Sequence, residues 1–149
     1  RDSITHIGYD SGDYVQFSNG SYIRHVISGT EYFRTDTGGI DVVGNITATG
    51  TITANSDERL KEDVKVIENP IEKIKAIRGV TYTRNDLEDK TTRHAGVIAQ
   101  EVETVLPEVV LENDEGIKSV AYGNMVSLLL EGMKEQQKQI DELKKKLGE

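Results

Sequence analysis

Residues 38–61 read GGIDVVGNITATGTITANSDERLK, and the character of the chain changes within this stretch. Three hexads of the form Gly-x-Ile-x-x-x run from Gly38 to Asn55. A fixed short period of this kind indicates a structure that repeats in space, with glycine at the backbone turns and isoleucine facing inward. From Ser56 onward the sequence is charged, and Ser56 is a favourable N-cap residue followed by acidic side chains. We therefore expect β structure up to residue 55 and a short helix or turn over 56–61.

The hexads bury too little apolar surface to fold as a single chain. One isoleucine contributes about 2 kcal/mol when it is buried, whereas ordering the backbone costs about 1–2 kcal/mol for each residue. Several chains wound around one another would share a core, which favours an intertwined, oligomeric β stem. An extended Thr/Gly linker is the alternative interpretation of the same residues.

The composition of the 149-residue chain divides at the same point. Six of its eight aromatic residues and eight of its 14 glycines precede residue 56, whereas both prolines follow it. Alternating β-branched and aromatic residues predict strands at 14–17 and 22–27, and the stretch before residue 56 shows no helical pattern. We therefore predict two domains, 1–55 and 56–149.

Charge and residue types exclude several classes of function. The net charge is −8, which argues against binding to a nucleic acid. No apolar run approaches the roughly 18 residues that span a bilayer, so we expect no membrane insertion. The absence of cysteine excludes thiol catalysis, and His6, His25 and His94 lack the spacing of metal ligands. The sequence therefore predicts no metal and no cofactor.

The second domain shows a mixture of helical and strand signals. Pro70 opens a helix over 70–78 that places isoleucines on one face and ends before glycine. Further along the chain, the patterns predict a strand at 80–84, a strand passing into a helix over 94–105, and a hairpin over 109–121. Together with the β-rich first domain, these elements predict an α+β fold.

The last segment of the chain carries a heptad pattern. Apolar or amide side chains alternate at spacings of three and four, which places residues 126, 133, 140 and 147 at a positions and 129, 136 and 143 at d positions. The charged sequence around them favours a coiled coil over about 124–148, in which Gln136 sets the register. An amphipathic helix packed on its own domain is the alternative, and Gly132 costs such a helix about 1 kcal/mol.

Ser56 and Lys61 form one candidate catalytic pair. A serine and a lysine can act as a hydrolytic dyad when the amine is neutral and close enough to take the hydroxyl proton. The spacing alone is weak support, because a helix cap and a surface lysine are the default explanation for these two residues.

Several motifs beyond the dyad occur in a characteristic order. They are SDERLK at 56–61, PIEKI at 70–74, Gly79-x-x-Tyr82, GVIAQEV at 96–102, LPEV at 106–109, Ser119-Val-x-Tyr122 and the terminal heptads. Together they resemble the chaperone-of-endosialidase family, the C-terminal intramolecular chaperone autoproteases of phage tail spikes and fibres. The domain is also similar to one in the myelin regulatory factors, but the repeats before it favour the phage context.

The resemblance implies a specific function. The domain would form a homotrimer and align three copies of the upstream stem, its folding client. It would then act once as a self-cleaving serine endopeptidase that cuts between Asn55 and Ser56, with Ser56 as nucleophile and Lys61 as general base. The stem would remain in the virion tail fibre or tailspike, where a host receptor is a possible partner, and the chaperone would be released in the host cytoplasm.

Two other functions fit parts of the sequence. A non-catalytic trimerisation module of a fibre would keep the same fold with Ser56 as a cap only. A receptor-binding adhesin tip would use the aromatic residues of 1–33 to stack on sugars, although packing within the stem also explains those residues.

Overall fold

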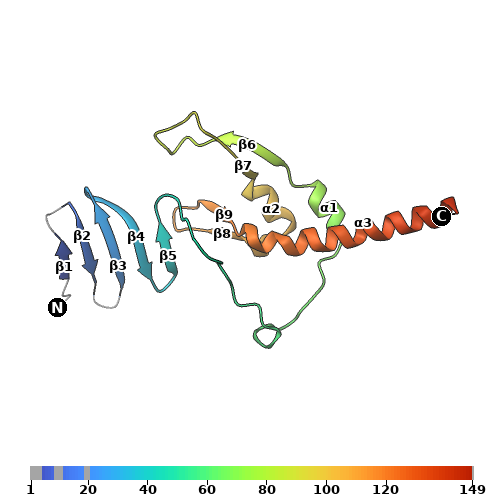
Figure 1. Ribbon diagram of the computed structural model, residues 1–149, viewed down its shortest axis with the longest axis horizontal. Coiled ribbons are helices and arrows are strands. Elements are labelled where there is room, and N and C mark those ends of the chain that lie inside the picture. Colours follow the sequence, from blue (N-terminus) through green and yellow to red (C-terminus); the bar gives the residue numbers. More distant parts are fainter. Residues whose placement is uncertain (1–4, 9–11, 19–20, 149) are drawn as a thin grey trace. The chain divides into compact units, whose positions relative to one another are not determined.

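The structure is a computed structural model that describes residues 5–8, 12–18 and 21–148 (Figure 1). The chain divides into two compact units, Arg1–Glu58 and Arg59–Glu149. The first unit contains a β-sheet, and the second combines helices with two short hairpins. This arrangement confirms the α+β class predicted from the sequence.

The first unit is an antiparallel meander in which each strand pairs with the next along the chain. Its strands are β1 (Thr5–Gly8), β2 (Tyr14–Phe17), β3 (Tyr22–Ile27), β4 (Thr30–Asp36) and β5 (Gly39–Val42). The bounds of β2 and β3 are those predicted from the alternating pattern, so both strand predictions are confirmed.

Polar contacts rather than an apolar core hold the described part of this sheet. Gln16 and Val26 are its buried residues, each 4% exposed. Arg24 lies over the same strands: its guanidinium donates hydrogen bonds to the side chains of Gln16 and Glu31, and it lies 5.6 Å from the ring centroid of Tyr22. A sheet with so little buried apolar surface gains little stability from the hydrophobic effect.

The Gly-x-Ile repeats bury no isoleucine within the single chain. Strand β5 lies in the first hexad, and residues 44–57, all of which the structure describes, form neither helix nor strand. The isoleucines of the three hexads are 65%, 71% and 78% exposed (Ile40, Ile46 and Ile52). Because the predicted stem requires neighbouring chains, it stays a prediction.

The second unit contains three α-helices and two hairpins. The helices are α1 (Pro70–Lys75), α2 (Ala99–Val105) and α3 (Val126–Leu147). The strands are β6 (Gly79–Thr83), β7 (Arg93–Val97), β8 (Val110–Glu112) and β9 (Lys118–Val120). Single 3-10 turns lie at Glu58–Leu60, Pro107–Val109 and Tyr122–Met125. The elements follow the predicted order, but α1 ends three residues earlier than predicted.

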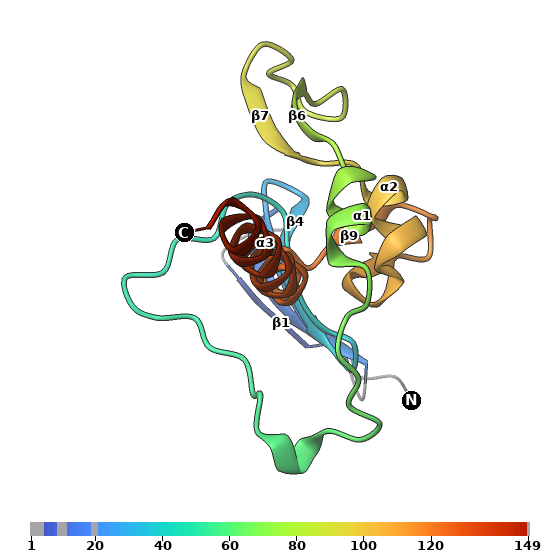
Figure 2. The same cartoon turned by 90° about the vertical axis from the view of Figure 1, so that its right-hand side faces the viewer.

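The core of the second unit lies where α1 and α2 meet the beginning of α3 (Figure 2). Its buried residues are Val102, Leu106, Val109 and Leu128. Gly132 lets α1 approach closely, because a Cβ atom at this position would lie 2.4 Å from Cδ1 of Ile74. The glycine that weakens the helix as an isolated segment thus makes room for the terminal methyl group of Ile74.

Helix α3 has two distinct apolar faces. Leu128 and Gly132 are buried on the face that meets the core. The predicted a and d positions lie elsewhere, and their apolar residues are 46–76% exposed (Val126, Leu129, Met133, Ile140, Leu143 and Leu147). The packed-helix alternative thus describes one face, whereas the coiled coil on the other face stays a prediction. Within the described residues, no helix has the length and apolar character needed to cross a membrane.

Candidate active site

The predicted scissile bond and dyad lie in an exposed part of the chain. Asn55, Ser56 and Lys61 are all exposed, and a single 3-10 turn, Glu58–Leu60, separates the serine from the lysine. This turn confirms the short helix or turn expected over 56–61. The boundary between the compact units follows Glu58, so Ser56 belongs to the first unit and Lys61 to the second. The pairing of the two side chains stays a prediction.

The chain after Lys61 is anchored to the core of the second unit. Ile67 packs against the cluster of buried residues, and Asn69 adopts a left-handed conformation (φ 51°) immediately before α1. Asp63 is also left-handed (φ 51°), and its carboxylate lies 2.8 Å from the ammonium of Lys65. Lys61 therefore precedes a segment whose path is fixed by one apolar anchor and two backbone turns.

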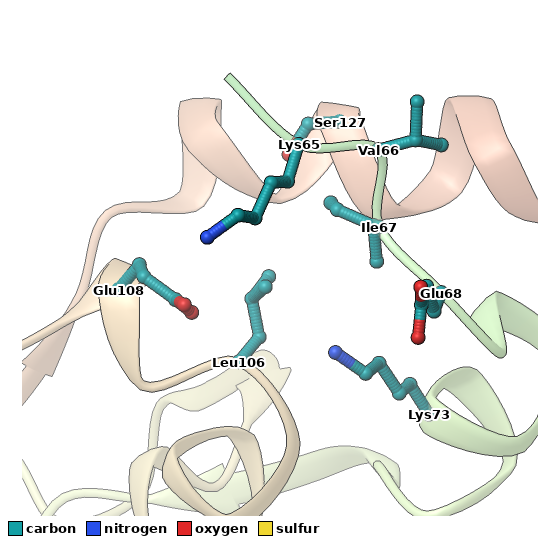
Figure 3. Close-up of a pocket in the computed structure, with 8 residues that line it drawn as sticks. All are labelled: Lys65, Val66, Ile67, Glu68, Lys73, Leu106, Glu108 and Ser127. Carbon is teal, nitrogen blue, oxygen red and sulfur yellow. The ribbon is translucent and has the colours of Figure 1, made fainter. Parts of the chain in front are cut away.

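A polar hollow of about 710 Å³ lies beside this segment (Figure 3). Figure 3 shows Lys65 and Lys73 reaching into it, with Leu106 and Ile67 between charged groups. Eight residues line it: Lys65, Val66, Ile67, Glu68, Lys73, Leu106, Glu108 and Ser127. Two ammonium groups and two carboxylates share the hollow, and neither Ser56 nor Lys61 lines it. In the described part of the chain, no three His, Asp or Glu residues are grouped as a metal site would require.

The motif residues Gly96 and Tyr122 meet in the structure. A Cβ atom on Gly96 would clash with the hydroxyl oxygen of Tyr122, so any larger residue here would have to displace the tyrosine side chain. The same hydroxyl accepts a hydrogen bond of 3.3 Å from the backbone N–H of Val97. Nearby, the rings of Tyr82 and His94 stack across the β6–β7 pair with centroids 5.9 Å apart. Tyr122 thus joins the 3-10 turn before α3 to β7, and the Tyr82–His94 pair joins β6 to β7.

Glu101, in the GVIAQEV motif, joins α2 to the end of α1. Its carboxylate accepts hydrogen bonds from the backbone N–H (3.0 Å) and the Nε (2.7 Å) of Arg78. The Arg78 guanidinium, followed by its backbone N–H, lowers the pKa of Glu101 below the usual range of a glutamate. Sequence reasoning did not identify this pair, because its two members are 23 residues apart and neither has a local signature of the contact.

Comparison with known proteins assigns a family to part of this chain. Residues 56–111 match the model of a peptidase family described as chaperone of endosialidase. A solved structure of the carboxy-terminal domain of the bacteriophage T5 L-shaped tail fibre with its intramolecular chaperone domain is similar with a TM-score of 0.46. It is 14% identical, and the match covers 99% of this chain and 54% of that chain.

Two curated relatives are long tail fibre proteins named Gp37. The protein of Salmonella phage S16 is 37% identical over 106 residues, which cover 66% of this chain and 14% of the relative. The protein of Enterobacteria phage K3 is 29% identical over 151 residues, which cover 97% of this chain and 12% of the relative. The chain thus spans about an eighth of the length of these relatives. Residues 56–111 of this chain therefore match the chaperone-of-endosialidase family.

Proposed function

We propose that residues 56–149 are the intramolecular chaperone of a phage tail fibre or tailspike. The chaperone domain forms a homotrimer, brings three copies of the stem in 1–55 into register, and then releases itself by cutting between Asn55 and Ser56. Ser56 is the nucleophile and Lys61 the general base. The mature stem remains in the tail of the virion, and the chaperone is left in the host cytoplasm.

The position at which the family match begins carries this proposal. The match starts at Ser56, the residue that would become the new N-terminus after cleavage. The Gly-x-Ile repeats end at the residue before it, Asn55. A cut at this bond would separate the stem from the chaperone without removing a residue from either.

The exposed apolar surfaces support assembly from several chains. Isoleucines of the hexads and the predicted seam of α3 are largely solvent-exposed in the single chain. The apolar residues of the α3 seam recur every three or four positions and stay exposed, and an exposed apolar surface of this kind is typical of an interaction site. The tail fibre relatives supply the context in which such a stem would function.

The proposed chemistry uses only groups of this chain and water. Lys61 takes the hydroxyl proton of Ser56 as the serine oxygen attacks the carbonyl carbon of Asn55. The peptide C–N bond then breaks, the amine of Ser56 receives the proton from Lys61, and an ester joins the two residues. Water hydrolyses the ester and leaves a carboxylate on Asn55 and a free hydroxyl and amine on Ser56.

Assembly would control this reaction through the charge of Lys61. The lysine must be neutral to accept a proton, and burial disfavours the charged form of an amine. Lys61 is exposed in the single chain. Neighbouring chains that cover it would therefore make the base competent only after the trimer has formed.

Mass spectrometry of the purified full chain tests the proposal. We expect two fragments, with Ser56 at the N-terminus of the second, and a single uncut species in Ser56→Ala and in Lys61→Ala. Lys65→Ala is the matched control, since Lys65 is an exposed lysine of the same segment and pairs with Asp63. Cleavage that persists in Ser56→Ala would contradict the dyad. A trimer that never cleaves would instead support the non-catalytic trimerisation module.

A further inference from the structure

An apolar hollow of about 290 Å³ opens beside the first turns of α3. It is lined by residues in α1 and just after it, in β7, in the 3-10 turn Tyr122–Met125 and at the start of α3, among them Ile74, Ile77, Val97, Tyr122, Met125 and Leu129. Tyr122 and Leu129 are 54% and 50% exposed, so the hollow is open to solvent on one side. None of the described residues of the second unit, 59–148, fills this volume.

The hollow is continuous with the predicted seam of α3. Leu129 occupies a d position and also lines the hollow. In the same heptad numbering, Met125 occupies a g position and Leu130 an e position. In a parallel coiled coil the g residue of one helix faces the e residue five positions further along in its neighbour. Met125, which lines the hollow, would therefore face Leu130 of the next helix.

Leu130 is an unusual residue for its position. The e and g positions of coiled coils normally carry charged side chains that pair between helices. Leu130 is instead a leucine that is 52% exposed on its own chain. The remaining e and g positions change along α3 from apolar near the core, through Gln137 and Gln139, to Lys144 and Lys146 at the tip. Pairing at the core end would therefore depend on apolar contact.

We propose that Leu130 of a second copy of this chain inserts into the apolar hollow. The inference rests on the homotrimer of the proposed function and specifies how its subunits contact each other. Each copy then supplies one leucine to the core of the next, and the core of every second unit is completed only when the ring of three copies closes. The partner that the hollow fits is thus the chain itself, in parallel orientation.

Cysteine crosslinking of the full chain tests this contact directly, because the native sequence has no cysteine. We expect Met125→Cys combined with Leu130→Cys to give a disulfide-linked trimer on a non-reducing denaturing gel after mild oxidation. The pair Ser127→Cys with Leu130→Cys is the control, since position 127 lies on the other side of the helix from position 125. Crosslinking of the first pair no stronger than the control overturns the inference.

Sedimentation measurements on two leucine variants give a second test. Leu130→Gln should weaken trimer association by about tenfold or more, because a buried leucine becomes a polar side chain. Leu111→Gln is the matched control, since Leu111 is 63% exposed on β8 and far from the seam in sequence. A native chain that sediments as a monomer would overturn the proposed trimer together with this contact. A native trimer that Leu130→Gln leaves unchanged would overturn the contact alone.

Discussion

In the first unit Ile40, Ile46 and Ile52 are 65–78% exposed, whereas in the second unit Ile74 and Ile77 pack against the buried core. Both sets are isoleucines, but they are six residues apart in the first unit and three apart in the second. Ile74 on α1 and Ile77 just after the end of this helix both reach a common core, but the isoleucines six apart in the repeats stay exposed within the single chain. The comparison teaches that the second unit has a buried core of its own, whereas the repeats of the first bury no isoleucine within the single chain.

The largest effect should come from the core of the second unit. Leu128 is 0% exposed, and Leu128→Ala should reduce the free energy of unfolding of this unit by about 2–5 kcal/mol. Urea unfolding followed by circular dichroism at the helical band measures the loss. The control Leu111→Ala removes a leucine that is 63% exposed and should change stability by less than about 0.5 kcal/mol. Equal losses in the two variants would remove the contrast between the units.

A smaller effect should appear in the repeats, and only in the assembled protein. Ile46→Ala should destabilise the trimeric stem by about 1.5–3 kcal/mol for each chain, because the side chain would be buried between chains. Hydrogen exchange of peptides from residues 39–57 measures the loss separately from the second unit. Thr47→Ala, at the adjacent position, is the matched control. Exchange that is equally fast in the native protein and both variants would favour the extended linker.

Packing between α1 and α3 offers a sharper test of the second unit. Gly132→Ala gains about 1 kcal/mol of helix propensity but forces a methyl group against Ile74, which costs about 1–3 kcal/mol. We expect a net loss of about 1 kcal/mol in thermal or urea unfolding. Ile74→Val combined with Gly132→Ala should recover stability relative to Gly132→Ala alone. Failure of the double variant to recover would mean that the two residues are not coupled.

The smallest effect concerns the dependence of stability on pH. Because hydrogen bonds from Arg78 lower the pKa of Glu101 in the folded state, their contribution is present above the ordinary glutamate pKa of about 4.3. It is lost as pH falls through the lower folded value. The urea midpoints of the native chain and Glu101→Gln should therefore differ at pH 7, and the difference should shrink as the pH falls below the ordinary glutamate pKa of about 4.3. For the control Glu142→Gln, on the exposed part of α3, the difference in urea midpoint from the native chain should not change with pH in this way.

The sequence was most informative where structure depends on local pattern. Strands β2 and β3 have their predicted bounds, because alternating side chains and flanking turns define them locally. Helix α1 ends at Lys75, and beyond it the N–H of Arg78 bonds to Glu101 of α2, a contact between distant residues that no local pattern indicates. The packing role of Gly132 could likewise not be predicted from the sequence, because it depends on the close approach of Ile74.

For the candidate site, the sequence indicated the family but not the hollows of the second unit. Order and identity of the motifs gave the family, which the match over 56–111 confirms. Neither hollow of the second unit was predicted, because residues from several separate elements line each of them. The dyad itself stays a prediction, since Ser56 and Lys61 fall on opposite sides of the boundary between the compact units.

The lysines at the end of α3 have a consequence for the order of assembly. Lys144, Lys145 and Lys146 suit the negative end of their own helix dipole. When three parallel helices meet, however, the same residues bring like charges together at the tip. Helix pairing should therefore begin at the core end, around Leu129, and proceed toward the tip. Assembly that starts at one fixed end would set the alignment of the three chains before the far end can pair out of register.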